Sequence, residues 1–131
     1  MKTKITTLLL ITLTGIIMFN FLSKKQNGMD ISTTEFKEKI KSQPGKVIDV
    51  RTLEEYNDGH LNITDAQYDW MNGNFHDAVE SMDKEETYYL YCRSGNRSGQ
   101  AAQMMRNRGF ENVYNIGGFE DIVRDGFESN R

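Results

Sequence analysis

The chain of 131 residues contains one cysteine, and this cysteine begins a short polar turn. The turn follows an aromatic, apolar stretch at 87–91 and precedes a helix-like stretch at 99–105. It reads Cys92, Arg93, Ser94, Gly95, Asn96, Arg97 and Ser98. Because the thiolate is the nucleophilic form of cysteine, a thiol pKa of about 8.5 must fall before it is abundant at neutral pH. The pattern predicts nucleophilic chemistry at Cys92.

The residues after Cys92 could stabilise an anion. A helix that begins near Ser98 would present unpaired N–H groups and a partial positive charge at its start. Gly95 lets the loop curl so that N–H groups point inward as an anion-binding nest. Arg93 and Arg97 add formal charge, and the polar side chains that could hold the loop are Ser94, Asn96 and Ser98. We therefore expect an exposed thiol beside a site for a sulfur anion or an oxyanion substrate.

Strand-like and helix-like stretches alternate along the rest of the chain. Expected strands cover 46–50, 66–68, 86–91 and 112–116, and expected helices cover 52–56, 71–82, 98–108 and 119–124. A further helix should begin at a capping box formed by Ser32 and Glu35 and end near Pro44. This alternation predicts an α/β domain with a central, mostly parallel sheet and helices on both faces.

Parallel strands should bring two separate segments to one site. Ligands of open α/β sheets bind beyond the carboxyl ends of the strands. Cys92 and Arg51 both follow predicted strands. Asp49 and Arg51 are expected to pair beside the site, with a structural role.

The N-terminal residues differ in composition from the rest. Residues 5–22 carry no charge and are flanked by lysines on both sides. We expect residues 1–23 to be a signal peptide or an N-terminal membrane anchor. A small-residue cleavage pattern is missing, which favours an anchor or an inefficiently cleaved signal. The expected linker is 24–30 and the expected domain is 31–131. Export would place the domain in the periplasm or another extracytoplasmic space.

The charge and cysteine content exclude some functions. Beyond the apolar segment the chain carries 14 basic and 19 acidic residues, so a broad nucleic-acid surface is not expected. One cysteine and two histidines offer no metal-ligand spacing, and no cofactor is implied. A lone cysteine is often buried and inert, but a free thiol in an exported domain favours a reactive role.

At this point the chain resembles the single-domain rhodaneses, a family of sulfurtransferases. The matching motifs are Val-Ile-Asp-Val-Arg at 47–51, Glu-Glu-Tyr with Gly-His-Leu within 54–61, the 91–98 loop, and the segment 109–118. Together they extend over residues 30 to 127. One segment departs: 62–68 lacks the Pro-Gly pair that often follows in the family, which puts the rim of the pocket in question.

The resemblance implies a rhodanese fold and a two-step mechanism. Cys92 would attack the outer sulfur of an anionic donor such as thiosulfate, and a thiol or cyanide would then remove that sulfur. Backbone N–H groups of residues 93–98 would hold the persulfide. Arg93 or Arg97 would attract the donor.

Two other interpretations remain open. A cysteine phosphatase needs five residues between cysteine and arginine, whereas four separate Cys92 from Arg97. A persulfide carrier or partner-binding module would use the same loop with a protein acceptor. His60 is expected to be packed and hydrogen-bonded, and His76 to lie on the surface. Aromatic residues expected in the core are Trp70, Tyr88, Tyr89, Tyr91 and Phe119.

Overall fold

The computed structural model describes residues 29–131. Its helices are α2 (Thr33–Ser42), α3 (Leu53–Asp58), α4 (Asn74–Val79), α5 (Asn96–Asn107) and α6 (Phe119–Arg124). Its strands are β1 (Lys46–Asp49), β2 (His60–Leu61), β3 (Ala66–Gln67), β4 (Tyr88–Cys92), β5 (Val113–Gly118) and β6 (Ser129–Asn130). The capping box of Ser32 and Glu35 at the start of α2 is confirmed.

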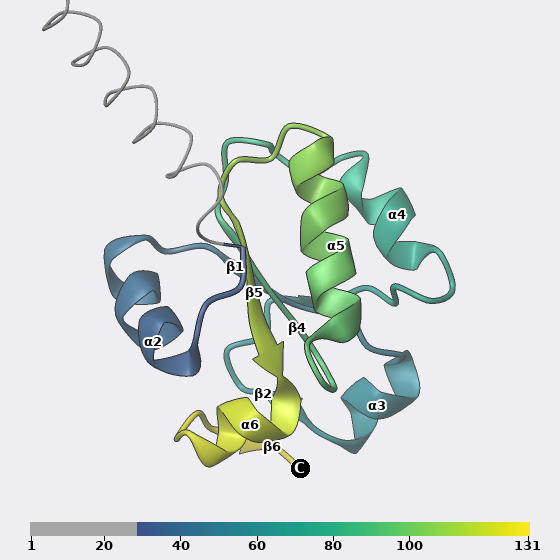
Figure 1. Ribbon diagram of the computed structural model, residues 1–131. Helices are drawn as coiled ribbons and strands as arrows, with labels where there is room; N and C mark the ends of the chain where they lie inside the picture. Colours follow the sequence, from purple (N-terminus) through teal and green to yellow (C-terminus); the bar gives the residue numbers. More distant parts are fainter. Residues whose placement is uncertain (1–28) are drawn as a thin grey trace, which may run out of the picture.

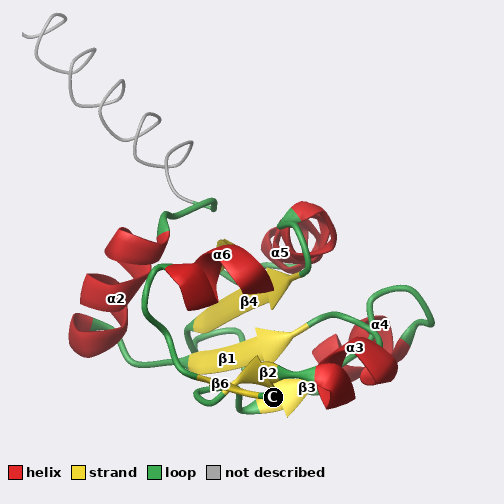
Figure 2. Ribbon diagram, turned by 90° about the horizontal axis from the view of Figure 1, so that it is seen from below, coloured by secondary structure: helices red, strands yellow, loops and turns green. Residues whose placement is uncertain are grey.

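Four strands form a parallel sheet in the order β3-β1-β4-β5. Their arrows point the same way where Figure 2 shows them. In Figure 1, α2 lies on one side of these strands and α4 and α5 lie on the other. The predicted α/β architecture is confirmed, and all carboxyl ends of the sheet meet at one edge.

Two apolar clusters sandwich the sheet. One face packs against α4 and α5 through buried residues that include Phe75, Leu90 and Met105. The opposite face packs against α2 and α6 through residues that include Phe36, Tyr89 and Ile122. Since β1 and β4 are covered on both faces, their apolar residues run consecutively instead of alternating. The central strand β4 is therefore held from both sides up to its last residue, Cys92.

Several element boundaries differ from the sequence expectations. Helix α5 begins at Asn96 and not at Ser98, because Gly95 adopts the left-handed conformation that ends the turn earlier. Helix α4 covers 74–79 and not 71–82, because Asp69, Asn72 and Gly73 form turns before it. Strands β2 and β6 were not predicted. They pair antiparallel with only two residues each, too few for a recognisable pattern.

The described part of the chain enters the fold along β5. Asp30 pairs in parallel with Asn115, and Ile31 N–H donates to the Asn115 carbonyl at 3.0 Å. Met29 and Asp30, expected in the linker, are thus part of the folded domain. The signal peptide or anchor expected at 1–23 lies outside the described residues. Among residues 29–131, every helix is too short or too polar to cross a membrane.

Candidate active site

Cys92 is the last residue of β4 and lies under the turn that leads into α5. Its thiol is free and fully buried, so the expectation of an exposed thiol was wrong. The expectation failed because the polar composition of the turn does not show which way the sulfur points. The Cys92 side chain faces inward and belongs to the apolar cluster that packs against α4 and α5. The exposed residues of the turn are Arg93, Ser94 and Asn96.

The sulfur is met by hydrogen-bond donors from the turn and the first turn of α5. Gly95 N–H donates to Cys92 Sγ at 3.1 Å, and the Ser98 hydroxyl lies 3.3 Å from the same atom. Burial by itself raises the pKa of Cys92. The Ser98 hydroxyl and the N–H groups of Ser98, Ser94 and Gly95 outweigh burial, and the pKa of the thiol is lowered. The site therefore favours the thiolate, as expected of a nucleophile.

Glycines allow the turn and β5 to approach each other closely. Gly95 has a φ of +90°, and a Cβ there would lie 3.3 Å from Gly117 Cα. A Cβ on Gly118 would lie 2.5 Å from the Arg93 carbonyl oxygen. Both contacts involve backbone atoms that cannot move independently. Gly117 and Gly118, part of the matching segment 109–118, are the last two residues of β5 and lie against the catalytic turn.

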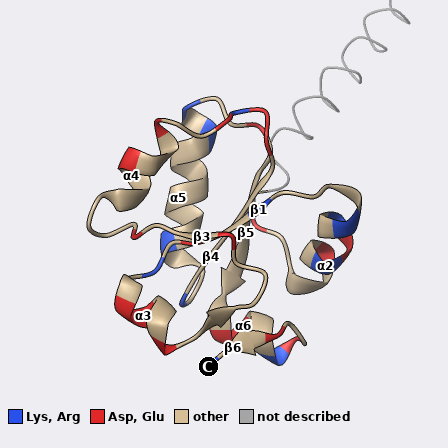
Figure 3. Ribbon diagram, turned by 180° about the vertical axis from the view of Figure 1, so that it is seen from behind, with Lys and Arg blue, Asp and Glu red and all other residues tan. Residues whose placement is uncertain are grey.

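Arg97 is held by an acidic residue of α3. Its guanidinium donates to both carboxylate oxygens of Glu55 at 2.8 Å, a bidentate pair of which both side chains are mostly buried. The pair is the main reason that the pKa of Glu55 falls to about 2. Helix α3 carries the red, acidic colour in Figure 3. Because Glu55 already neutralises Arg97, this arginine fastens the turn to α3 and is poorly suited to attract a donor.

Asp49 and Arg51 form the pair that was expected beside the site. Arg51 donates to both Asp49 carboxylate oxygens at 2.7 to 3.0 Å, and both side chains are buried. Arg51 also donates to the Gly59 carbonyl at 2.7 Å and lies over the Phe119 ring. These contacts join the end of β1 to the segment after α3 and to α6.

A cleft of about 320 Å³ opens beside the turn, between α3 and α6. Its lining residues are Arg51, Glu55, Asp58, Gly59, Arg93, Phe119, Glu120 and Arg131. Arg131 pairs with Glu120 at 2.6 Å. Within the described part of the chain, Arg93 is the cleft arginine without an ion-pair partner. Cys92 does not line the cleft, but its neighbour Arg93 does, so a positive charge faces the cleft beside the catalytic turn.

Asn115 contributes to the site although it was not among the predicted residues. Its side chain is buried in β5, accepts from the Ser98 hydroxyl at 2.7 Å and donates to the Gly95 carbonyl at 3.0 Å. The available signal was the asparagine at 115, which lies among the apolar and aromatic residues of 113–116. A buried polar side chain needs partners, and those partners had to come from another segment.

The histidines lie away from the sulfur chemistry. His60 Nδ1–H donates to the Tyr56 carbonyl at 3.0 Å and the ring stacks on that of Tyr56, which confirms a packed histidine. His76 is partly buried and stacks on Trp70, so the expectation of a surface histidine was wrong. The four other aromatic residues expected in the core are buried, and Trp70 is partly buried. Residues 29–131 contain no cluster of metal-ligand side chains.

Comparisons with known proteins agree with this geometry. Residues 32–125 match the rhodanese-like domain family. Thiosulfate sulfurtransferase PspE of Escherichia coli is 34% identical over 77 residues, which cover 58% of this chain and 72% of PspE. YrkF of Bacillus subtilis, which bears the name of a sulfur carrier protein, is 31% identical over 89 residues, which cover 66% of this chain. The chain spans less than half of the length of YrkF, 46%.

The fold comparison points the same way. The crystal structure of a rhodanese-like domain protein from Staphylococcus aureus superimposes with a TM-score of 0.61 at 32% identity, covering 76% of this chain and 95% of that one. Sulfur transfer is the activity named among these relatives, and a cradled thiolate at the end of a parallel strand suits it. The chain belongs to the rhodanese-like domain family.

Proposed function

We propose that this protein is a sulfurtransferase that moves a sulfane sulfur from thiosulfate or a similar anionic donor to a thiol or cyanide. The observation that carries the proposal is the ring of donors on the buried Cys92 sulfur. Gly95 N–H and the Ser98 hydroxyl approach the sulfur at 3.1 and 3.3 Å. Such donors stabilise a thiolate before reaction and a persulfide anion after it.

The first step forms the persulfide. Cys92 thiolate attacks the outer sulfur of thiosulfate, and a new S–S bond forms to Cys92. The S–S bond within thiosulfate breaks, and sulfite leaves with the bonding electron pair. Arg93 attracts the dianionic donor into the cleft beside the turn. Because the sulfur is fully buried, the turn must move slightly for the donor to reach it.

The second step returns the enzyme to its starting state. An acceptor thiolate or cyanide attacks the outer sulfur of the Cys92 persulfide, and the Cys92 thiolate leaves. Since the chain has no second cysteine, the persulfide cannot resolve into an internal disulfide. The sulfur therefore leaves with an external acceptor.

The proposal is tested by turnover of purified protein with thiosulfate and cyanide. Thiocyanate formation should be catalytic, and Cys92→Ser should abolish it without changing the unfolding midpoint. A Cys92→Ser variant that keeps the full rate would refute the assignment. Hydrolysis of a phosphate monoester that depends on Cys92 would instead favour the phosphatase interpretation.

A persulfide carrier is the second candidate, supported by the similarity to YrkF. A carrier would load sulfur from a protein donor or deliver it to a protein thiol. Thiosulfate turnover would then be slow, whereas transfer from the preloaded Cys92 persulfide to a protein thiol would be fast. Measuring both rates on the same preparation separates a carrier from a thiosulfate enzyme.

We also propose that the domain acts outside the cytoplasm. The charge-free segment 5–22, between pairs of lysines, supports export and retention at the membrane. Cell fractionation should place the protein with exported proteins. Terminal sequencing that finds a start after residue 22 would refute the anchor and leave a cleaved signal peptide.

A further inference from the structure

The Asn115 side chain is a junction between the catalytic turn and the start of the domain. Its Nδ2 donates to Asp30 Oδ1 at 2.9 Å and to the Gly95 carbonyl at 3.0 Å. Its Oδ1 accepts from the Ser98 hydroxyl at 2.7 Å and from Gly117 N–H at 3.2 Å. An amide has two donor hydrogens and two acceptor lone pairs, so this side chain uses its full capacity.

The partners leave only one orientation for the amide. The Gly95 carbonyl can only accept and Gly117 N–H can only donate, which places Nδ2 toward the turn and Oδ1 toward Ser98. A hydroxyl has one hydrogen, and Ser98 Oγ has two acceptors within reach, Asn115 Oδ1 at 2.7 Å and Cys92 Sγ at 3.3 Å. Asn115 thus fixes the position of Gly95, whose N–H donates to the sulfur, and of Ser98, for whose single hydroxyl hydrogen Asn115 Oδ1 and the sulfur compete.

Asp30 completes the junction from the other side. It lies in the segment 29–31, which pairs with β5 on the edge that β4 does not use. The pairing brings its carboxylate to Asn115 Nδ2, and the residue is otherwise exposed. The connection from Asp30 through Asn115 to Gly95 and Ser98 therefore joins the first described residues to the turn around Cys92.

We infer that Asn115 and Asp30 are positioning residues for Cys92, and that pairing of segment 29–31 with β5 keeps the thiolate donors in place. The inference rests on the proposed function in taking Cys92 as the nucleophile. Neither residue touches the sulfur. Each acts by limiting the motion of Gly95 and Ser98, so that the Gly95 N–H needs no reordering when the sulfur becomes an anion and the Ser98 hydroxyl has only to turn its hydrogen.

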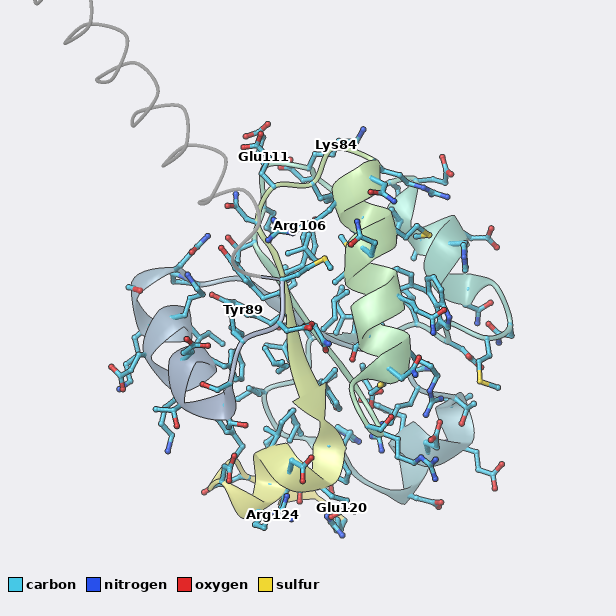
Figure 4. The ribbon with its side chains drawn as sticks, in the orientation of Figure 1. Lys84, Tyr89, Arg106, Glu111, Glu120 and Arg124 are labelled. Atoms are coloured by element: carbon cyan, nitrogen blue, oxygen red, sulfur yellow. The ribbon has the colours of Figure 1, made fainter. Side chains whose placement is uncertain are left out.

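Titration of the thiolate by its ultraviolet absorbance tests the inference on the full chain, which has one cysteine. Asp30→Ala removes the acceptor and should raise the titration midpoint by roughly half a pH unit, the effect of losing part of one hydrogen bond. Asp30→Asn keeps an acceptor oxygen and should leave the midpoint near that of the wild type. The matched control is Glu111→Ala, which removes an exposed carboxylate at the end of the molecule opposite α6 (Figure 4).

Two results would overturn the inference. An unchanged titration midpoint in Asp30→Ala would show that Asp30 has no effect on the Cys92 thiolate. An equal lowering of the midpoint by Asp30→Ala and Asp30→Asn would show that Asp30 acts through its negative charge and not through its hydrogen bond to Asn115. In an Asn115→Ala background, Asp30→Ala should add no shift. If the Asn115→Ala protein does not fold, the comparison of Asp30→Ala with Asp30→Asn is sufficient to test the inference.

The test does not depend on sulfur transfer. The charged groups flanking the site, Arg97 of α5 with Glu55 of α3 and the Asp49–Arg51 pair after β1, are the same in every variant. The titration needs no sulfur donor, so a protein that transfers no sulfur could still show the coupling. If the protein transfers sulfur but the Asp30 variants do not shift the thiolate midpoint, this inference is refuted and the proposed function stands.

Discussion

At the scale of single residues, the two arginines of the turn have different roles. The sequence showed two positive charges near Cys92 but not that Glu55, 42 residues from Arg97, neutralises one of them. Such a pairing depends on how α3 is placed, and no local pattern encodes it. The nucleophile itself could be predicted, since its turn is continuous in sequence. The partners of Asn115 could not, because they lie 17 and 20 residues away.

Arg93→Gln should therefore weaken donor binding more than the chemical step. We expect the KM for thiosulfate to rise about fivefold to tenfold with kcat nearly unchanged, since an unpaired charge at the cleft attracts the dianion in the ground state. Steady-state kinetics measure this directly. The exposed Arg124 on α6 (Figure 4) provides the matched control, and Arg124→Gln should leave KM unchanged. An equal fall in kcat and kcat/KM for Arg93→Gln would contradict the assigned role.

At the scale of elements, the turn depends on the close approach of β5. The strand and helix order was predictable because buried strands read as apolar runs and capped helices carry start signals. The closeness of Gly118 to the Arg93 carbonyl was not predictable, since it depends on the register between β4 and β5. That register includes an irregularity between Leu90 and Tyr91, just before Cys92.

Gly118→Ala should damage activity beyond its effect on stability. The new Cβ would meet the Arg93 carbonyl at 2.5 Å, so β5 or the turn must move, at a cost of about 1–3 kcal/mol. Gly45→Ala is the matched control, because its Cβ would meet the Thr87 backbone at the other end of the sheet. Urea unfolding should show a similar loss for both variants, but only Gly118→Ala should lose sulfur transfer. Equal activities would show that the turn tolerates the shift.

At the scale of the whole molecule, the fold brings α3, α5 and α6 together at the carboxyl end of one parallel sheet. The bidentate pair between Glu55 and Arg97 joins two of these helices across the site. The structure therefore makes folding stability depend on the ionisation of a residue that also holds the catalytic turn. Motifs in the sequence predicted the overall architecture, but the short β2–β6 pairing that closes the C-terminal side escaped prediction.

Glu55 should make the protein sensitive to acid. Its pKa is about 2 in the folded protein and ordinarily 4.5, so the unfolded chain binds the proton first as the pH falls. The stabilisation is present above pH 4.5, is lost between pH 4.5 and 2, and amounts to up to about 3 kcal/mol. Glu55→Gln should flatten the pH dependence of the unfolding free energy in that window. Exposed Glu54→Gln is the control, and identical curves for Glu55→Gln and wild type would contradict the prediction.

Intact-mass spectrometry of the protein after incubation with thiosulfate tests the central claim most directly. We predict that one sulfur atom, about 32 Da, is added at Cys92, that the Cys92→Ser variant gains nothing, and that cyanide removes the added mass. Wild-type protein that gains no mass with thiosulfate or any other sulfane donor would contradict the account.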